Sequence, residues 1–184
     1  MKGICVRSEI KPLKKVLLHR PGRELLNLTP DKLPELLFDD IPFLPVAQQE
    51  HDAFAQILRD NGVEVVYLED LMTEVLSLHP EVQEPFLHQW LVEGNIRTRR
   101  WQDECMKYLN DNFKGKALVE KTMEGITLKE MGAEAFSYSL QDLIAPLDDL
   151  VVAPMPNLYF TRDPFASVGT GVLLHKMYSV TRCR

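Results

Sequence analysis

Short apolar runs and helix-spaced apolar positions follow one another in the first part of the chain. The run Lys15–His19 is largely apolar and is closed by Pro21 and Gly22. Its length and the Pro-Gly stop favour a strand that is buried on both faces. Residues 23–45 carry four further prolines. We expect this segment to be irregular, with one short helical turn.

A helix and a second strand follow. Between Val46 and Asn61 one helix face is apolar. Its members recur at steps of four, three and four residues: Ala47, His51, Phe54 and Leu58. Among them, His51 is expected to be buried or half-buried and satisfied by hydrogen bonds. Gly62 stands where a left-handed cap would end the helix, and residues 63–68 form a β-branched run typical of a strand.

From residue 71 to 132 the pattern becomes helical. Trp101, Cys105 and Tyr108 recur at steps of four and three. Strand-like runs are absent apart from the ambiguous Lys116–Val119, which favours a small all-helical bundle. Strand character returns at Leu150–Ala153. Two further apolar runs, at 165–168 and 172–175, are joined by a Gly-containing loop and predict a hairpin.

Composition and charge exclude several classes of protein. The chain of 184 residues has a formal net charge of −6 and no basic tract, so nucleic acid is not expected as a partner. The basic residues Arg97, Arg99 and Arg100 are interspersed with acids and indicate a solvated helix end. No apolar run approaches the ~20 residues of a membrane span, and the N-terminus lacks the apolar core of a signal peptide. We expect a cytoplasmic protein.

The three cysteines stand at unrelated positions. A zinc site or a disulfide framework would need cysteines in pairs at short, defined intervals. Cys5, Cys105 and Cys183 therefore indicate a reduced protein without a metal site.

The segment Met155–Phe165 carries the most informative chemistry. It places an amide, an aromatic ring and a carboxylate at spacings of three, in Asn157, Phe160 and Asp163. The prolines within and around it favour an extended backbone rather than a helix. Because the predicted hairpin follows at once, we expect the carboxylate of Asp163 at the mouth of a sheet.

These segments, in this order, resemble the arginine deiminase family of guanidino-group-modifying enzymes. The matching segments are Lys11–Gly22, Leu36–Asp40, Glu50–Phe54 and, most specifically, Pro156–Asp163. The resemblance implies hydrolysis of free L-arginine to L-citrulline and ammonia, without a cofactor. It also implies a homo-oligomer for the full-length enzyme.

The resemblance implies an α/β fold of the pentein type. In this fold ββαβ units form a five-bladed propeller, and a helical domain is inserted after the first unit. On this interpretation residues 1–70 form the first α/β unit, residues 71–149 the inserted all-helical bundle, and residues 150–184 the start of a second unit. The chain would then hold a partial propeller.

Recognition of arginine makes defined chemical demands. A guanidinium is planar and charged, and its donors form a fork that carboxylates meet in bidentate fashion. By resemblance, Asp163 is a guanidinium-binding carboxylate, and Phe160 covers the guanidinium or its aliphatic stem. Leu37 and Asn157 line the amino-acid end of the site. Arg182 holds the α-carboxylate.

The nucleophile expected of the family is a Cys thiolate. None of the three cysteines and none of the five histidines matches the family's catalytic positions. The residues after Arg182 also depart from the family pattern. We therefore expect this chain to be an N-terminal portion of the enzyme and to be inactive alone.

Each site residue also has a purely structural interpretation. Asp163 would cap the turn before the hairpin, and Asn157 would be an ordinary turn residue. Phe160 and Leu37 would be core residues, and Arg182 a solvated surface residue.

Two other functions stay open. One is another guanidino-modifying enzyme, such as an amidinotransferase or a dimethylarginine hydrolase, although these relatives lack the helical insert. The other is a non-catalytic binding or assembly module that uses the helical block.

Overall fold

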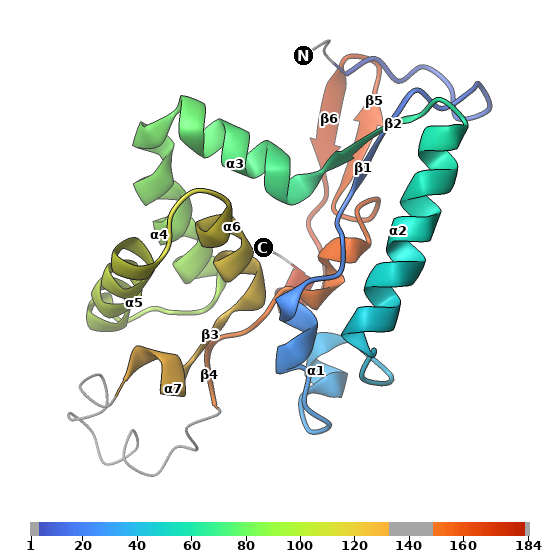
Figure 1. Ribbon diagram of the computed structural model, residues 1–184. Helices are drawn as coiled ribbons and strands as arrows, with labels where there is room; N and C mark the ends of the chain where they lie inside the picture. The colour runs from blue at the N-terminus through green and yellow to red at the C-terminus, as the bar shows by residue number, and fades with distance from the viewer. Residues whose placement is uncertain (1–3, 133–148, 183–184) are drawn as a thin grey trace.

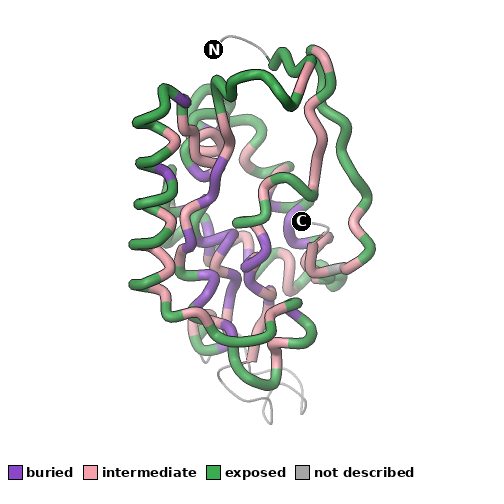
Figure 2. Tube along the Cα trace, turned by 90° about the vertical axis from the view of Figure 1, so that its right-hand side faces the viewer, coloured by how far each residue is buried: buried purple, intermediate pink, exposed green. Residues whose placement is uncertain are grey.

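The computed structural model describes residues 4–132 and 149–182 of the chain. Helices and short strands are mixed, with a strand-helix-strand region beside a group of helices (Figure 1). Buried residues gather in the middle and lower part of the molecule in the view of Figure 2. Among the described residues, no helix is both long and apolar enough to cross a membrane.

Two parallel strands and their connecting helix form the first region. β1 (Lys15–Leu18) pairs with β2 (Glu64–Tyr67) along its whole length. The long connection that parallel pairing requires contains α2 (Leu44–Asp60), which packs against β2. Both predicted strands are confirmed. The expected burial on both faces is wrong, because within the described chain this sheet has two strands and only Leu18 of β1 is buried.

α2 confirms the predicted helix but corrects its core face. Ala55 is completely buried, whereas Phe54 is 52% exposed because it lines a groove instead of packing under the sheet. His51 is half-buried as predicted, but its Nδ1 has no hydrogen-bond partner among the described residues, so the expectation of a satisfied histidine is wrong. Gly62 has a φ of 74° and follows the helix end, as predicted.

The segment between β1 and α2 is more ordered than the sequence suggested. It forms the 3-10 helix η1 (Arg23–Asn27) and the helical turn α1 (Leu33–Leu36). Pro34 stands in the first turn of α1, where a missing N–H costs nothing. Leu25, Leu28 and Leu36 pack into a small core of their own, and this burial holds the segment in place.

The central part of the chain is mostly helical, and its helices lie together on one side of Figure 1. They are α3 (Leu68–Leu78), η2 (Pro80–Val82), α4 (Gln83–Glu93), α5 (Arg99–Asn112), α6 (Lys116–Glu124) and α7 (Leu128–Met131). Leu91, Cys105, Leu109 and Leu118 belong to the main core. The ambiguous run at 116–119 lies in α6, so it is helix and not strand.

One short strand in this region was missed. β3 (Ile126–Thr127) pairs with β4 (Leu150–Val152) in antiparallel fashion. A two-residue strand has no periodicity that a sequence pattern could reveal. Gly125 precedes it with a φ of 82°, and a Cβ there would lie 2.5 Å from the carbonyl oxygen of Val152. Glycine is thus required where the two segments cross.

The last part of the chain holds the candidate motif. η4 (Pro156–Tyr159) is a 3-10 helix, which corrects the expected extended backbone, since a proline at the first position is compatible with a helical turn. The predicted hairpin is confirmed as β5 (Phe165–Val168) and β6 (Gly171–Leu174). The 3-10 helix η5 (Val180–Arg182) follows. Cys183 lies outside the described residues.

Candidate functional site

Asp163, Phe160 and Arg182 meet in space. An Nη2 donor of Arg182 lies 2.6 Å from Oδ2 of Asp163. The guanidinium carbon of the same arginine lies 5.7 Å from the ring centroid of Phe160. The side chain of Arg182 is 18% exposed and that of Asp163 is 52% exposed. The guanidinium of Arg182 is therefore held by a carboxylate and an aromatic face, and it is less exposed to solvent than the carboxylate that binds it.

The backbone of Asp163 is fixed by the hairpin. His175, which directly follows β6, donates its N–H to the carbonyl of Pro164 at 2.9 Å, and its Nδ1 contacts the carbonyl oxygen of Asp163 at 2.9 Å. Within residues 4–132 and 149–182, the carboxylate of Asp163 accepts from Arg182 and caps no backbone N–H. The described residues therefore give no support to the interpretation of Asp163 as a turn cap, because its carboxylate binds a side chain and not the turn backbone.

Asn157 is buried and contacts the turn that carries Leu37. Its Nδ2 donates to the carbonyl oxygen of Leu36 at 2.8 Å. Leu37 ends α1 with a φ of 62° and a ψ of 40°, and the residue is 49% exposed. A left-handed conformation is uncommon for a leucine and costs on the order of 1 kcal/mol or more. An exposed leucine held in this conformation does not serve the core.

A second contact joins this turn to the end of the chain. Thr181 donates its hydroxyl to the carbonyl oxygen of Glu35 at 2.9 Å. Since Thr181 precedes Arg182, the turn at Leu37 is tied both to Asn157 and to the segment that carries Arg182. The five residues singled out from the sequence therefore belong to one connected region.

Phe160 also lines an apolar groove of about 430 Å³. The groove walls are mainly aromatic rings and prolines, with two carboxylates and one histidine among them. The lining residues are Pro21, Glu24, Leu25, Phe38, Pro42, Ala47, Glu50, His51, Phe54, Pro156, Tyr159 and Phe160. Phe160 thus connects the groove with the Asp163–Arg182 pair.

Several known proteins are similar to this chain over nearly its whole length. A family model described as arginine deiminase matches residues 34–184. The chain is 57% identical to an arginine deiminase of Treponema denticola over 184 residues, which are 100% of this chain and 45% of that relative. It is 53% identical to an arginine deiminase of Streptococcus equi subsp. zooepidemicus over 182 residues. These residues cover 98% of this chain and 44% of the relative.

The chain belongs to the arginine deiminase family. An arginine deiminase of Streptococcus pyogenes serotype M1 is also similar, with 53% identity to this chain over 185 residues, which are 44% of the relative's length. The chain therefore spans somewhat less than half the length of the curated relatives it matches.

One buried cluster of this arginine deiminase family chain was missed by sequence reasoning. His19 follows β1, Glu24 belongs to η1, and Glu69 lies in the first turn of α3; all three are less than a tenth exposed. Nε2 of His19 lies 2.9 Å from Oε1 of Glu24, and its Nδ1 lies 3.1 Å from Oε2 of Glu69. The signal that could have found it is the pairing of β1 with β2, because it brings their carboxyl ends together.

The cluster changes the acid-base properties of His19. Burial by itself would lower the pKa of His19, but the hydrogen bonds and charges of Glu24 and Glu69 outweigh this and raise the pKa to about 9. The neighbouring His51 behaves differently. Burial lowers the pKa of His51, and the positive charge of His19 adds to this, against the opposing effect of Asp52.

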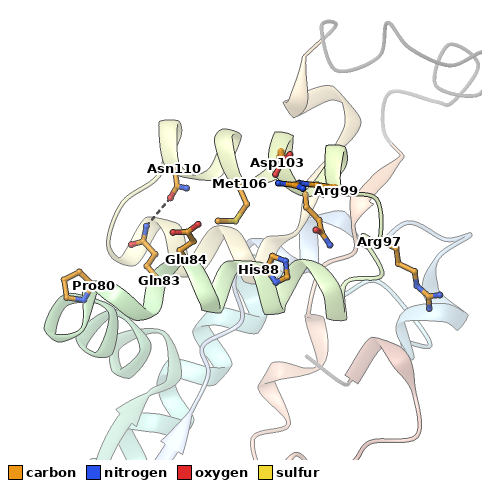
Figure 3. Close-up of a pocket in the computed structure, with 10 residues that line it drawn as sticks. Pro80, Gln83, Glu84, His88, Arg97, Arg99, Asp103, Met106 and Asn110 are labelled. Atoms are coloured by element: carbon orange, nitrogen blue, oxygen red, sulfur yellow. Dashed lines mark hydrogen bonds between the residues drawn. The ribbon is translucent and has the colours of Figure 1, made fainter.

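A larger depression, of about 780 Å³, lies away from these residues between α4 and α5 (Figure 3). Its walls carry both signs of charge, as in Arg97 and Glu84, and Gln83 donates to Asn110 across it at 3.1 Å. Arg99 opens α5 and is exposed, so the predicted solvated helix end is confirmed. None of the five predicted site residues lines this depression.

The described residues include two free cysteines, the exposed Cys5 and the buried Cys105. In the part of the chain that the structure describes, no group of three or more His, Cys, Asp or Glu side chains is placed to hold a metal ion. Cys105 is buried in the helical core, and burial raises the pKa of its thiol to about 12. A thiol of this kind stays protonated at neutral pH and is a poor nucleophile.

Proposed function

We propose that this chain forms the substrate-binding part of an arginine deiminase, which hydrolyses free L-arginine to L-citrulline and ammonia. Membership of the family supports the reaction. The observation that carries the proposal is the binding of a guanidinium, that of Arg182, by Asp163 and Phe160. A carboxylate and an aromatic face that accept this group can also accept the guanidinium of a free arginine.

Each predicted residue receives a role in this proposal. Asp163 binds the substrate guanidinium, and Phe160 packs against its plane or its stem. Asn157 and the exposed Leu37 line the amino-acid end. Arg182 binds the α-carboxylate, so the ion pair between Arg182 and Asp163 must open when arginine enters. The ion pair within the chain is then replaced by two ion pairs with the substrate: Asp163 with its guanidinium and Arg182 with its α-carboxylate.

The reaction also needs groups that this chain does not supply in our proposal. A Cys thiolate attacks the central guanidinium carbon, and an acid/base group gives a proton to the departing ammonia. Water then releases citrulline from the enzyme. By family resemblance, the thiolate and the acid/base group lie outside this chain, because none of its three cysteines and none of its five histidines matches the family's catalytic positions.

The proposed fold of the whole enzyme is the pentein propeller. Residues 1–70 would be its first α/β unit, residues 71–149 a helical insert, and residues 150–184 the start of the second unit. The β1-α2-β2 region, the helices from α3 to α6 and the β5-β6 hairpin support this division. We further propose a cytoplasmic homo-oligomer for the full-length enzyme.

The proposal is tested with a chimera, in which this chain is followed by the remaining C-terminal part of the Treponema denticola relative. The purified chimera should form citrulline and ammonia from free L-arginine in equal amounts. A monodisperse chimera that released neither product would contradict the proposal. Turnover of dimethylarginine, or amidine transfer to an amine, in place of arginine hydrolysis would favour the related enzyme classes.

A further inference from the structure

The two ring nitrogens of His19 both face carboxylate oxygens in a buried place. A neutral imidazole has one donor nitrogen and one acceptor nitrogen, whereas an ionised carboxylate only accepts. In a neutral His19 the acceptor nitrogen would thus face a carboxylate oxygen of Glu24 or of Glu69, and this contact between two acceptors would be repulsive. The imidazolium donates from both nitrogens and satisfies both contacts.

Within the cluster of His19, Glu24 and Glu69, the imidazole of His19 binds the additional proton in preference to either carboxylate. An imidazole is a stronger base than a carboxylate, with an ordinary pKa of about 6.5 against about 4.3 for glutamate. A buried charge is tolerated when it is paired and hydrogen-bonded. His19 meets this condition twice, because each of its nitrogens has a negatively charged partner.

Glu24 is held in one place by several contacts. Besides His19, the backbone N–H of Gly22 donates to Oε1 of Glu24 at 2.6 Å. A Cβ on Gly22 would lie 2.6 Å from Oε2 of Glu24, so the carboxylate fills the space that a side chain would need. Glu24 also lines the same groove as Phe160.

We propose that His19, as a doubly protonated imidazolium, positions Glu24 in the wall of the groove that Phe160 lines, and is thereby a positioning residue of the proposed arginine site. The role at the arginine site rests on the proposed function. The charge state of His19 and its effect on Glu24 do not.

Other charged groups near His19 are already arranged around the cluster. From the α2 side come His51 and Asp52, and Asp52 accepts from Nε of Arg20 at 2.7 Å. Glu69 comes from α3 and Glu24 from η1. Since Arg20 is engaged by Asp52, His19 is the cation in direct contact with both buried glutamates. A neutral His19 would offer only one ring donor to the two glutamates. Glu24 would then be held by the N–H of Gly22 with a weakened contact to His19.

The charge state is tested by NMR of the chain with ¹⁵N-labelled histidine. We expect both ring nitrogens of His19 to stay protonated through pH 8 and to titrate near pH 9. Glu24→Gln and Glu69→Gln should each lower the midpoint of this titration. A neutral imidazole at pH 7.5, in a parent chain that shows dispersed signals, would overturn the proposal.

The positioning role is tested with His19→Gln in the chimera. We expect KM for arginine to rise about tenfold while kcat stays within about threefold, because a groove wall moves and the reacting groups do not. His79→Gln is the matched control, since His79 is exposed and contacts Glu81 at 3.3 Å. An unchanged KM, or unchanged NMR signals of the Phe160 ring, would overturn the positioning role.

The two proposals fail separately. A parent chimera without citrulline formation would contradict the proposed function, yet the titration of His19 would still be decided by NMR. A His19 that titrates below pH 7 in an active chimera would overturn the positioning role and leave the proposed function intact.

Discussion

Arg182 donates to Asp163 at 2.6 Å while its guanidinium lies 5.7 Å from the ring centroid of Phe160. The chain's own guanidinium thus occupies the two groups that we propose for the substrate. Asp163 is half exposed, and an ion pair of this kind contributes about 0–1 kcal/mol. An internal pair this weak can be displaced by arginine, which brings a second charged anchor with it.

Arg182→Ala should raise KM for arginine in the chimera. Removal of Arg182 frees Asp163, a gain of at most about 1 kcal/mol. It also removes the charge partner that we propose for the α-carboxylate of arginine, a loss of about 1.5–3 kcal/mol. The loss is larger, so we expect KM to rise about tenfold in steady-state kinetics. Arg162→Ala is the control, because Arg162 pairs with Glu9 at 3.0 Å on the surface. A fall in KM for Arg182→Ala would show that Arg182 only competes with the substrate.

Asn157→Ala should destabilise the chain. Asn157 is buried, and its loss leaves the carbonyl of Leu36 without this donor, a cost of about 1–3 kcal/mol. Urea unfolding measures the change. Asn61→Ala removes a bond of the same length, 2.8 Å, from an exposed asparagine to Ile57 and should cost clearly less. Equal effects of the two substitutions would argue against a structural role of the buried amide.

The stability of the chain should fall as the pH rises from 6.5 to 9.5. The pKa of His19 is raised in the folded state to about 9, so its contribution is fully present below the unfolded pKa of about 6.5 and is lost as the pH passes 9. The rise corresponds to about 3 kcal/mol at most. Burial lowers the pKa of His51, so the unfolded chain binds a proton there near pH 6.5 and this group opposes the trend only at the lower end of the window. Above about pH 8.5 the buried Cys105 adds to the fall, because its pKa is raised to about 12 and only the unfolded thiol ionises.

Denaturant unfolding at several pH values measures this effect. His19→Gln should flatten the profile between about pH 7 and 8.5, below the range in which Cys105 contributes, whereas His79→Gln should preserve it. A parent chain of constant stability over this range would contradict the buried imidazolium.

Gly22→Ala should disturb the position of Glu24 and destabilise the chain. Its Cβ would lie 2.6 Å from Oε2 of Glu24, which is far shorter than a normal contact. We expect a cost of about 1–3 kcal/mol in unfolding experiments. Gly171→Ala is the control, because the nearest atom to its Cβ would be the carbonyl oxygen of Val168 at 3.8 Å. Equal stability of the two variants would show that Glu24 adapts freely.

Local patterns predicted the elements that are long or strongly periodic. α2, both strands of the parallel pair and the β5-β6 hairpin follow from apolar spacing and glycine positions. Shorter elements escaped, because β3 spans two residues and η4 begins at a proline that was interpreted as a break. Phe54 was misplaced because helical spacing identifies an apolar face but not what covers it.

The sequence predicted the members of the candidate site but not the contacts between them, and Leu37 and Arg182 were named only by family resemblance. Asn157, Phe160 and Asp163 stand in one motif and were found together. The contact between Arg182 and Asp163 spans 19 positions, and the contact between His19 and Glu69 spans 50. Such contacts depend on how the hairpin and the parallel strands bring distant segments together, which spacing along the chain does not show.

The most direct test is citrulline formation by the chimera carrying Asp163→Asn, compared with Asp70→Asn. Both aspartates are about half exposed and pair with a cation at 2.6 Å, Arg182 in one case and Lys116 in the other. If Asp163 binds the substrate guanidinium, its substitution should lower kcat/KM by about 10²- to 10⁴-fold, equivalent to about 3–5 kcal/mol. Asp70→Asn should stay within a few-fold of the parent. Near-parental activity of a folded Asp163→Asn chimera would contradict the proposed site.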